Sequence, residues 1–116
     1  MAVDAETHLP VRTRGCCVSV RTRLPDDTAR EVAEVHKALA DPTRLQMLHM
    51  LKAASAPICV CDFTAAFALS QPTVSHHLAW LRRTGFVTST KDGVWSHHRI
   101  REDLSPTARA VLATVP

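Results

Sequence analysis

The chain has 116 residues, 46% of them hydrophobic, and a formal net charge of +3 at pH 7. This length and composition predict one compact domain, small enough to gain stability from dimerisation. They argue against a membrane or secreted protein, because the sequence has neither an apolar run of about 18 residues nor the apolar core of a secretory signal. We therefore expect a cytoplasmic protein with no membrane partner, in which clustered cysteines favour metal binding or redox chemistry over structural disulfides.

Residues 1–25 differ from the rest of the chain and are predicted to form an extended N-terminal arm. They combine Pro10, Gly15 and Pro25 with several arginines and show no sustained helical or strand period. The arm carries Cys16 and Cys17, two of the four cysteines. Residues 26–116 are predicted to form a single folded domain.

Two helices are predicted after the arm. Asp26 or Asp27 can cap the first helix, and Asp41 followed by Pro42 is typical of the start of a second. The apolar stripes of the two helices are Val32, Val35 and Leu39, and then Leu45, Leu48 and Leu51.

Residues 56–84 predict two more short helices, joined by a tight connection at Leu69 and Ser70. Ser70 is a good N-cap, and Pro72 fits the first turn of the helix that follows. One stripe of that helix is apolar, made of Val74, Leu78 and Leu81. The opposite face is small and polar, made of Ser75, His76, Ala79 and Arg83. Such a face is suited to entering a groove.

A basic hairpin and a last helix complete the chain. Asp92-Gly93 is a hairpin turn signal between two predicted strands. His97 and His98 should point to opposite faces of the second strand, one packed and the other exposed. Ser105-Pro106 predicts the start of the last helix.

The predicted fold is therefore mainly α with a small β-hairpin, in the order of a winged helix-turn-helix. In such a module the second helix of the turn docks in the major groove of DNA. Flanking basic residues and the hairpin contact phosphates.

The strings KALADPTRLQML, CVCDF and SQPTVSHHLAWLRRTGFV closely resemble the ArsR/SmtB family of metal-responsive, dimeric transcriptional repressors. The resemblance covers residues 32–100. It implies a winged-helix homodimer that binds a palindromic double-stranded operator and leaves it when a metal ion or metalloid binds. Four residues match the family's recognition helix and are the expected DNA contacts: Gln71, Thr73, Ser75 and His76. Lys91 and Arg99 match its basic wing. Arg83, on the polar face of the same helix, is a further expected DNA contact.

Cys59 and Cys61 form a Cys-Val-Cys motif with two interpretations. They could be small buried core residues, or reactive thiols whose pKa is lowered by a helix N-terminus. The resemblance implies that they are metal ligands on the third helix. Arsenic sensors with a self-contained site carry a further cysteine a few residues later, where this chain has Thr64, so a site made of this motif alone would be incomplete.

Cys16 and Cys17 could supply the missing ligands. In a similar branch of the family, which senses cadmium, lead and zinc, arm cysteines of one subunit join the Cys-Val-Cys motif of the other. Zinc, cadmium or lead would accept up to four sulfurs, and trivalent arsenic or antimony would take three. Because the arm cysteines here are adjacent rather than spaced, both sulfur counts stay open.

We predict a repressor with no permanently bound cofactor, whose inducer is a soft metal ion or trivalent metalloid. One alternative is a thiol redox sensor of the same fold, in which an arm thiol and a helix thiol form a disulfide or persulfide. A second is a DNA-binding regulator whose metal signal comes from a partner protein. No enzyme is expected, because no cysteine is paired with a base near a glycine-rich loop.

Overall fold

The computed structural model describes residues 22–116, so Cys16 and Cys17 of the predicted arm lie outside the described residues. The elements in chain order are α1 (Asp26–Leu39), α2 (Pro42–Ala53), β1 (Ile58–Cys59), α3 (Val60–Phe67), α4 (Gln71–Arg83), β2 (Val87–Asp92), β3 (Trp95–Ile100) and α5 (Pro106–Leu112). This is the predicted winged helix-turn-helix, with α3 and α4 as the helical pair and β2 and β3 as the wing. None of the helices between residues 22 and 116 combines the length and apolar character that crossing a membrane requires.

Side-chain caps explain where three of the helices begin. Asp41, Ser70 and Ser105 each accept a hydrogen bond from a backbone N–H three residues later, and a proline occupies the first turn that follows. These predictions are confirmed. For α1 the prediction was wrong, because Pro25 is the N-cap and makes no side-chain cap bond. Asp26 and Asp27 instead lie in the first turn, where their negative charge suits the helix dipole.

The hydrophobic core joins the helices to the base of the wing. Phe63, Phe86 and Met47 are fully buried within it. The predicted apolar stripe of α4 is confirmed, since Val74, Leu78 and Leu81 are at most 1% exposed. Burial of each such side chain contributes about 2 kcal/mol. This packing holds one face of α4 against the domain and leaves the opposite face to solvent.

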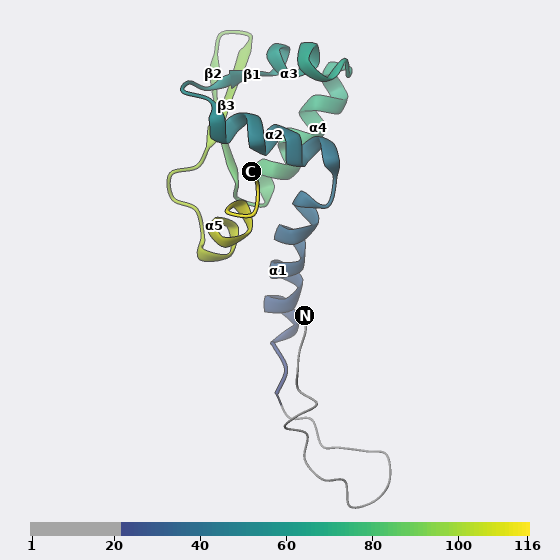
Figure 1. Ribbon diagram of the computed structural model, residues 1–116, viewed down its shortest axis with the longest axis vertical. Coiled ribbons are helices and arrows are strands. Elements are labelled where there is room, and N and C mark those ends of the chain that lie inside the picture. The colour runs from purple at the N-terminus through teal and green to yellow at the C-terminus, as the bar shows by residue number, and fades with distance from the viewer. Residues whose placement is uncertain (1–21) are drawn as a thin grey trace, which may run out of the picture.

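The sheet has three antiparallel strands in the order β1-β3-β2. Asp92 and Trp95 are the last pair of the β2–β3 ladder, and Gly93 turns the hairpin with φ of 65°. β1 was not predicted, because two residues cannot display an alternating pattern. It pairs Ile58 with His98 and Cys59 with His97. The hairpin tip and α3 lie at one end of the domain, whereas α1 and α5 lie at the other (Figure 1).

Arg44 fixes the junction between α1, α2 and α4. Its Nε donates to the carbonyl oxygen of Ala38 at 2.7 Å, and its Nη2 donates to the carbonyl oxygen of Lys37 at 3.1 Å. Both carbonyls belong to the last turn of α1, where a cation is favourable. The same guanidinium lies 4.7 Å from the centre of the Trp80 ring on α4. One side chain therefore ties the end of α1 to the face of α4.

His98 is the packed member of the two wing histidines, at 3% exposure, while His97 is half-buried. The Nε2 atom of His98 lies 3.1 Å from the Ser96 hydroxyl oxygen, and the Nδ1 atom of His98 has no hydrogen-bond partner among the described residues. Burial lowers the pKa of His98 to about 4, with smaller contributions from the nearby Arg82 and His97. The imidazole is therefore neutral in the folded protein at neutral pH.

His98 should make the fold less stable in mild acid. Its pKa is about 4 in the folded protein and about 6.5 in the unfolded chain. Between these values the unfolded chain binds more protons, so the unfolding free energy falls as the pH falls. A step from pH 7.5 to 5.0 should cost roughly 2 kcal/mol through this group, measured by urea unfolding at fixed protein concentration.

The unfolding free energy of the His98→Gln variant should fall by roughly 2 kcal/mol less than that of the wild type over the same pH step. The matched control is His76→Gln, which removes an exposed histidine. A reduced pH dependence that is confined to His98→Gln is assigned to the buried ring. If His98→Gln and the wild type lost equal stability between pH 7.5 and 5.0, a buried neutral His98 would be contradicted.

Candidate nucleic-acid interface and thiol pair

The outer face of α4 presents a set of polar side chains near its N-terminal end. Gln71, Thr73, Ser75 and His76 are all exposed. The cap at Ser70 and the left-handed backbone of Ala68 (φ 54°) make the short connection that sets α4 against α3. All four predicted contacts on α4 are therefore accessible to solvent.

His77 is held inside the domain instead of on this surface. It is half-buried, and its Nδ1 lies 4.0 Å from the Asp41 carboxylate and 3.4 Å from the Arg44 guanidinium. Burial lowers the pKa of His77, and the Asp41 carboxylate opposes that shift. His77 is therefore a packed residue of α4 and lies apart from its exposed polar side chains.

A groove of about 380 Å³ separates α4 from the wing. Lys91, on β2, is exposed and lines this groove together with Gln71 and Ser75 of α4. Arg99, on β3, lies outside the groove lining, with its Nη1 3.8 Å from the Glu102 carboxylate. Two of the predicted α4 residues and one predicted wing residue thus face the same groove.

Arg82 also lines this groove, although it is not among the predicted DNA contacts. The sequence contains a signal for it, because Gln71, Ser75, Leu78 and Arg82 follow one another at the spacing of a single helical face. The polar face predicted from the sequence contained Arg83, whereas Arg82 lies on the flank of α4 that borders the wing.

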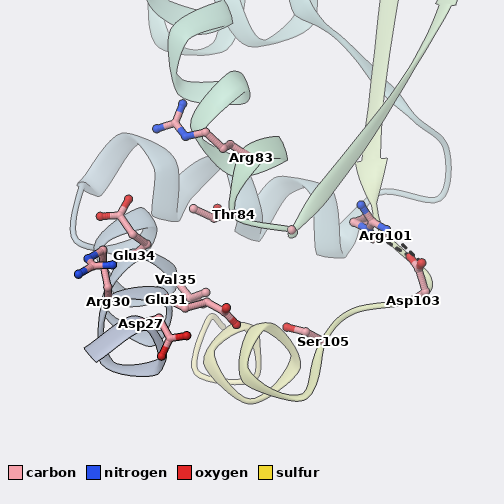
Figure 2. A pocket seen from close by; sticks show the side chains of 11 residues that line it. Asp27, Arg30, Glu31, Glu34, Val35, Arg83, Thr84, Arg101, Asp103 and Ser105 are labelled. Atoms are coloured by element: carbon pink, nitrogen blue, oxygen red, sulfur yellow. Dashed lines mark hydrogen bonds and ion pairs between the residues drawn. The ribbon is translucent and has the colours of Figure 1, made fainter. Parts of the chain in front are cut away.

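Arg83 lies at the opposite end of α4 from Gln71, about 18 Å along the axis at 1.5 Å per residue. Its guanidinium lies 4.8 Å from the centre of the Trp80 ring, so Trp80 has Arg44 and Arg83 as neighbours. Arg83 lines a cavity from the α4 side, and Glu34 and Arg30 line it from α1 (Figure 2). The cavity there measures about 630 Å³ and is lined by Asp27, Arg30, Glu31, Glu34, Val35, Arg83, Thr84, Gly85, Arg101, Asp103 and Ser105.

The two thiols of the Cys-Val-Cys motif lie where β1 becomes α3. Cys59 is the N-cap of α3, and its Sγ accepts a hydrogen bond from the N–H of Cys61 at 3.4 Å. The Asp62 carboxylate accepts from the N–H of Cys59 at 3.1 Å. This reciprocal arrangement is a capping box with sulfur in place of the usual hydroxyl. Only Cys61 lies within the helix, and Cys59 caps it from the strand side.

The two sulfurs lie 2.9 Å apart, with the Cys61 thiol donating to the Cys59 sulfur. Cys59 is buried and Cys61 is exposed. The hydrogen bond to Cys59 raises the pKa of Cys61, because it stabilises the protonated thiol. The expectation of a lowered thiol pKa at this helix start was therefore wrong for Cys61.

A depression of about 250 Å³ contains both thiols. Thr64, which stands where self-contained arsenic sensors are expected to have a third cysteine, lines this depression. Its hydroxyl donates to the carbonyl oxygen of Cys61 at 2.8 Å. Trp95, at the wing, lines another side. The depression also includes Gln71, the first residue of α4. The thiol pair and the polar face of α4 are therefore immediate neighbours.

The chemistry of this pair fits part of a soft-metal site. Two thiols that face one depression could provide two thiolates to a soft ion. Within residues 22–116, no group of three or more histidine, cysteine or acidic side chains is arranged to hold a metal ion. The described residues thus provide two sulfurs, and the other predicted ligands, Cys16 and Cys17, lie outside them.

Comparison with known proteins finds relatives of this chain in one family of regulators. Residues 41–89 match the bacterial regulatory proteins of the arsR family. The chain is 41% identical over 73 residues to an uncharacterised HTH-type transcriptional regulator of Methanocaldococcus jannaschii, covering 63% of this chain and 81% of that protein. It is 37% identical over 79 residues to the arsenical resistance operon repressor of Escherichia coli, covering 68% and 67% of the two chains.

A solved structure supports the same relationship. The homodimeric winged helix-turn-helix DNA-binding domain of a possible ArsR-family transcriptional regulator from Mycobacterium bovis superposes with a TM-score of 0.61. The two are 31% identical, and the match covers 78% of this chain and 82% of that one. Sequence and fold comparisons therefore agree.

The cap at Cys59 predicts that two substitutions will differ in stability. Cys59→Ser keeps a side chain that accepts the Cys61 N–H bond, whereas Cys59→Ala leaves that donor without its cap. We expect the alanine variant to be less stable than the serine variant by about 1 kcal/mol in urea unfolding. Equal stability of the two variants would contradict a capping role for Cys59.

Proposed function

Because the chain belongs to the ArsR family of bacterial regulatory proteins, we propose that it acts in the cytoplasm as a homodimeric repressor that leaves a palindromic operator when its thiols bind a soft metal ion or trivalent metalloid. DNA binding and transcription regulation are properties of the family. The homodimer is supported by the M. bovis relative. The arsenic response is supported by the E. coli relative, which is an arsenical resistance operon repressor. The proposal is for a regulator and not an enzyme.

In this proposal the exposed face of α4 contacts the operator in the major groove. Gln71, Thr73, Ser75 and His76 are the residues assigned to bases and phosphates. Lys91 and Arg99 of the wing contact the backbone, which positions the protein without selecting sequence. Arg83, at the far end of α4, is assigned to a phosphate contact.

The observation that carries the proposal is the depression shared by the thiol pair and Gln71. Thiolates of Cys59 and Cys61 would bind the inducer there, with Cys16, Cys17 or both from the arm as further ligands. Coordination would restrain α3 against α4 and change the placement of the DNA-contacting face. An inducer that binds the DNA-free conformation more tightly than the DNA-bound conformation lowers the operator affinity. The ratio of its affinities for the two conformations limits the size of this effect.

The redox alternative predicted from the sequence joins an arm thiol to a helix thiol. A redox switch within the Cys-Val-Cys motif is favoured by a different observation, namely the 2.9 Å separation of the Cys59 and Cys61 sulfurs. Thiols held this close to a neighbouring cysteine are placed to react when one is oxidised. Release of DNA by peroxide in metal-free buffer, reversed by a thiol reductant, would favour it over the metal proposal. Stoichiometric metal binding by the purified chain would argue against a separate sensing partner.

The test uses an operator selected in vitro from a random duplex library. Reduced, metal-free protein should bind this duplex, and arsenite, cadmium or lead should lower the affinity by about 5- to 150-fold, as expected for a coupling free energy of about 1–3 kcal/mol. Cys59→Ser combined with Cys61→Ser should bind the duplex normally and no longer respond. Fluorescence anisotropy measures the affinity, and thiolate charge-transfer absorption counts the sulfurs per ion.

Cys16→Ser combined with Cys17→Ser provides the matched comparison for the arm. If the arm completes the site, this variant should also bind DNA and lose most of its response to the ions. Normal release of the duplex from the Cys59 and Cys61 double variant would refute thiolate-controlled release.

A further inference from the structure

The groove between α4 and the wing contains cations but no carboxylates. Its lining is Val60, Gln71, Ser75, Leu78, Arg82, Ser89, Lys91, Val94, Ser96 and His98. The cavity of Figure 2 differs, because four acidic side chains there face three arginines. Opposite charges largely cancel in that cavity, whereas the groove beside α4 keeps a net positive charge.

Arg82 and Lys91 are also free to bind a ligand. Both are exposed, and among residues 22–116 neither forms an ion pair or a side-chain hydrogen bond. The neighbouring wing arginines differ, since Arg99 pairs with Glu102 and Arg101 pairs with Asp103 through two bonds of 3.0 and 3.1 Å. Both cations that line the groove are therefore unpaired among the described residues.

The floor of the groove offers neutral hydrogen-bonding groups. Ser75 and Ser89 contribute hydroxyls, whereas the Ser96 hydroxyl already bonds to His98 Nε2 at 3.1 Å. His98 is 97% buried, and its Nδ1 has no partner among the described residues. An unpaired buried polar atom costs about 1–3 kcal/mol, which a ligand or a bridging water can offset. Two cations surrounded by several potential donors are suited to a tetrahedral oxyanion.

We propose that the groove between α4 and the wing binds one phosphate group of the DNA backbone, with Arg82 and Lys91 as its charged ligands. This inference rests on the proposed function, because it requires α4 and the wing to lie on DNA. A helix in the major groove has the DNA backbone along its flank, and the wing borders the groove beside α4 from the other side. A phosphate between them would be held from both sides, so the contact would fix the angle of α4 in the groove.

The test compares the DNA affinity of folded variants that each lack one positive charge. Arg82→Gln and Lys91→Gln should each weaken binding of a random-sequence 30-bp duplex by about tenfold at low salt and reduce the salt slope by about 1. Arg82→Lys, which keeps the charge, should retain most of the salt slope. Arg30→Gln removes the same charge from an exposed position on α1 and should change affinity by less than about twofold.

A second measurement separates DNA phosphate from free phosphate. Inorganic phosphate is titrated into the DNA-free protein at constant ionic strength, and amide NMR shifts are followed at Ser75 and Ser89. Phosphate-induced shifts combined with normal duplex affinity in Arg82→Gln and Lys91→Gln would overturn the proposal in favour of a free-anion site. Affinity losses equal to that of Arg30→Gln would overturn it as well.

Failure of the proposed function has a different result. In that case the wild-type protein would bind no duplex at any salt concentration, so the variants would have nothing to lose. A loss of duplex affinity that is specific to Arg82→Gln and Lys91→Gln supports the phosphate site. This conclusion does not depend on whether metal ions release the protein from DNA.

Discussion

The junction at Cys59 governs how the two chemical features of this protein lie relative to each other. Cys59 ends β1, pairs with His97 of the wing, and caps α3 through its sulfur. One residue therefore belongs to the sheet and to the helix-turn-helix at once. Because strand pairing and capping are both directional, the thiols are held beside the wing and next to the start of α4. A thiol pair on a free loop would have no such fixed relation to the DNA-facing surface.

A second set of contacts gives α4 its orientation. Arg44 bonds to carbonyls at the end of α1 and lies over Trp80, while Val74, Leu78 and Leu81 are buried in the core. The apolar contacts supply most of the stabilising free energy. The polar contacts of Arg44 add direction, since a planar guanidinium makes its hydrogen bonds in a fixed geometry. The exposed face of α4 is consequently rigid relative to α1 and α2.

The groove beside α4 connects the thiols to the proposed phosphate contact. Val60, Gln71, Val94 and Ser96 line both the thiol depression and the groove. A change in the separation of α3, α4 and the wing would alter both spaces together. Under the proposed function, thiolate coordination and phosphate binding would then compete for the placement of the same side chains. This gives the coupling a physical route made of shared contacts instead of distance alone.

The sequence by itself determined most of the fold, because its signals are local. Caps at Asp41, Ser70 and Ser105, the Asp92-Gly93 turn and the α4 stripe each depend on residues a few positions apart, and all were recovered. The roles assigned to the DNA contacts and to the four cysteines stay predictions. Only the tertiary structure decided that β1 pairs with β3, that Arg82 faces the wing and Arg83 faces α1, and that Cys61 donates to Cys59. Pairing between distant segments and the local environment of a thiol both depend on which surfaces meet in the folded chain, and no short-range pattern records that.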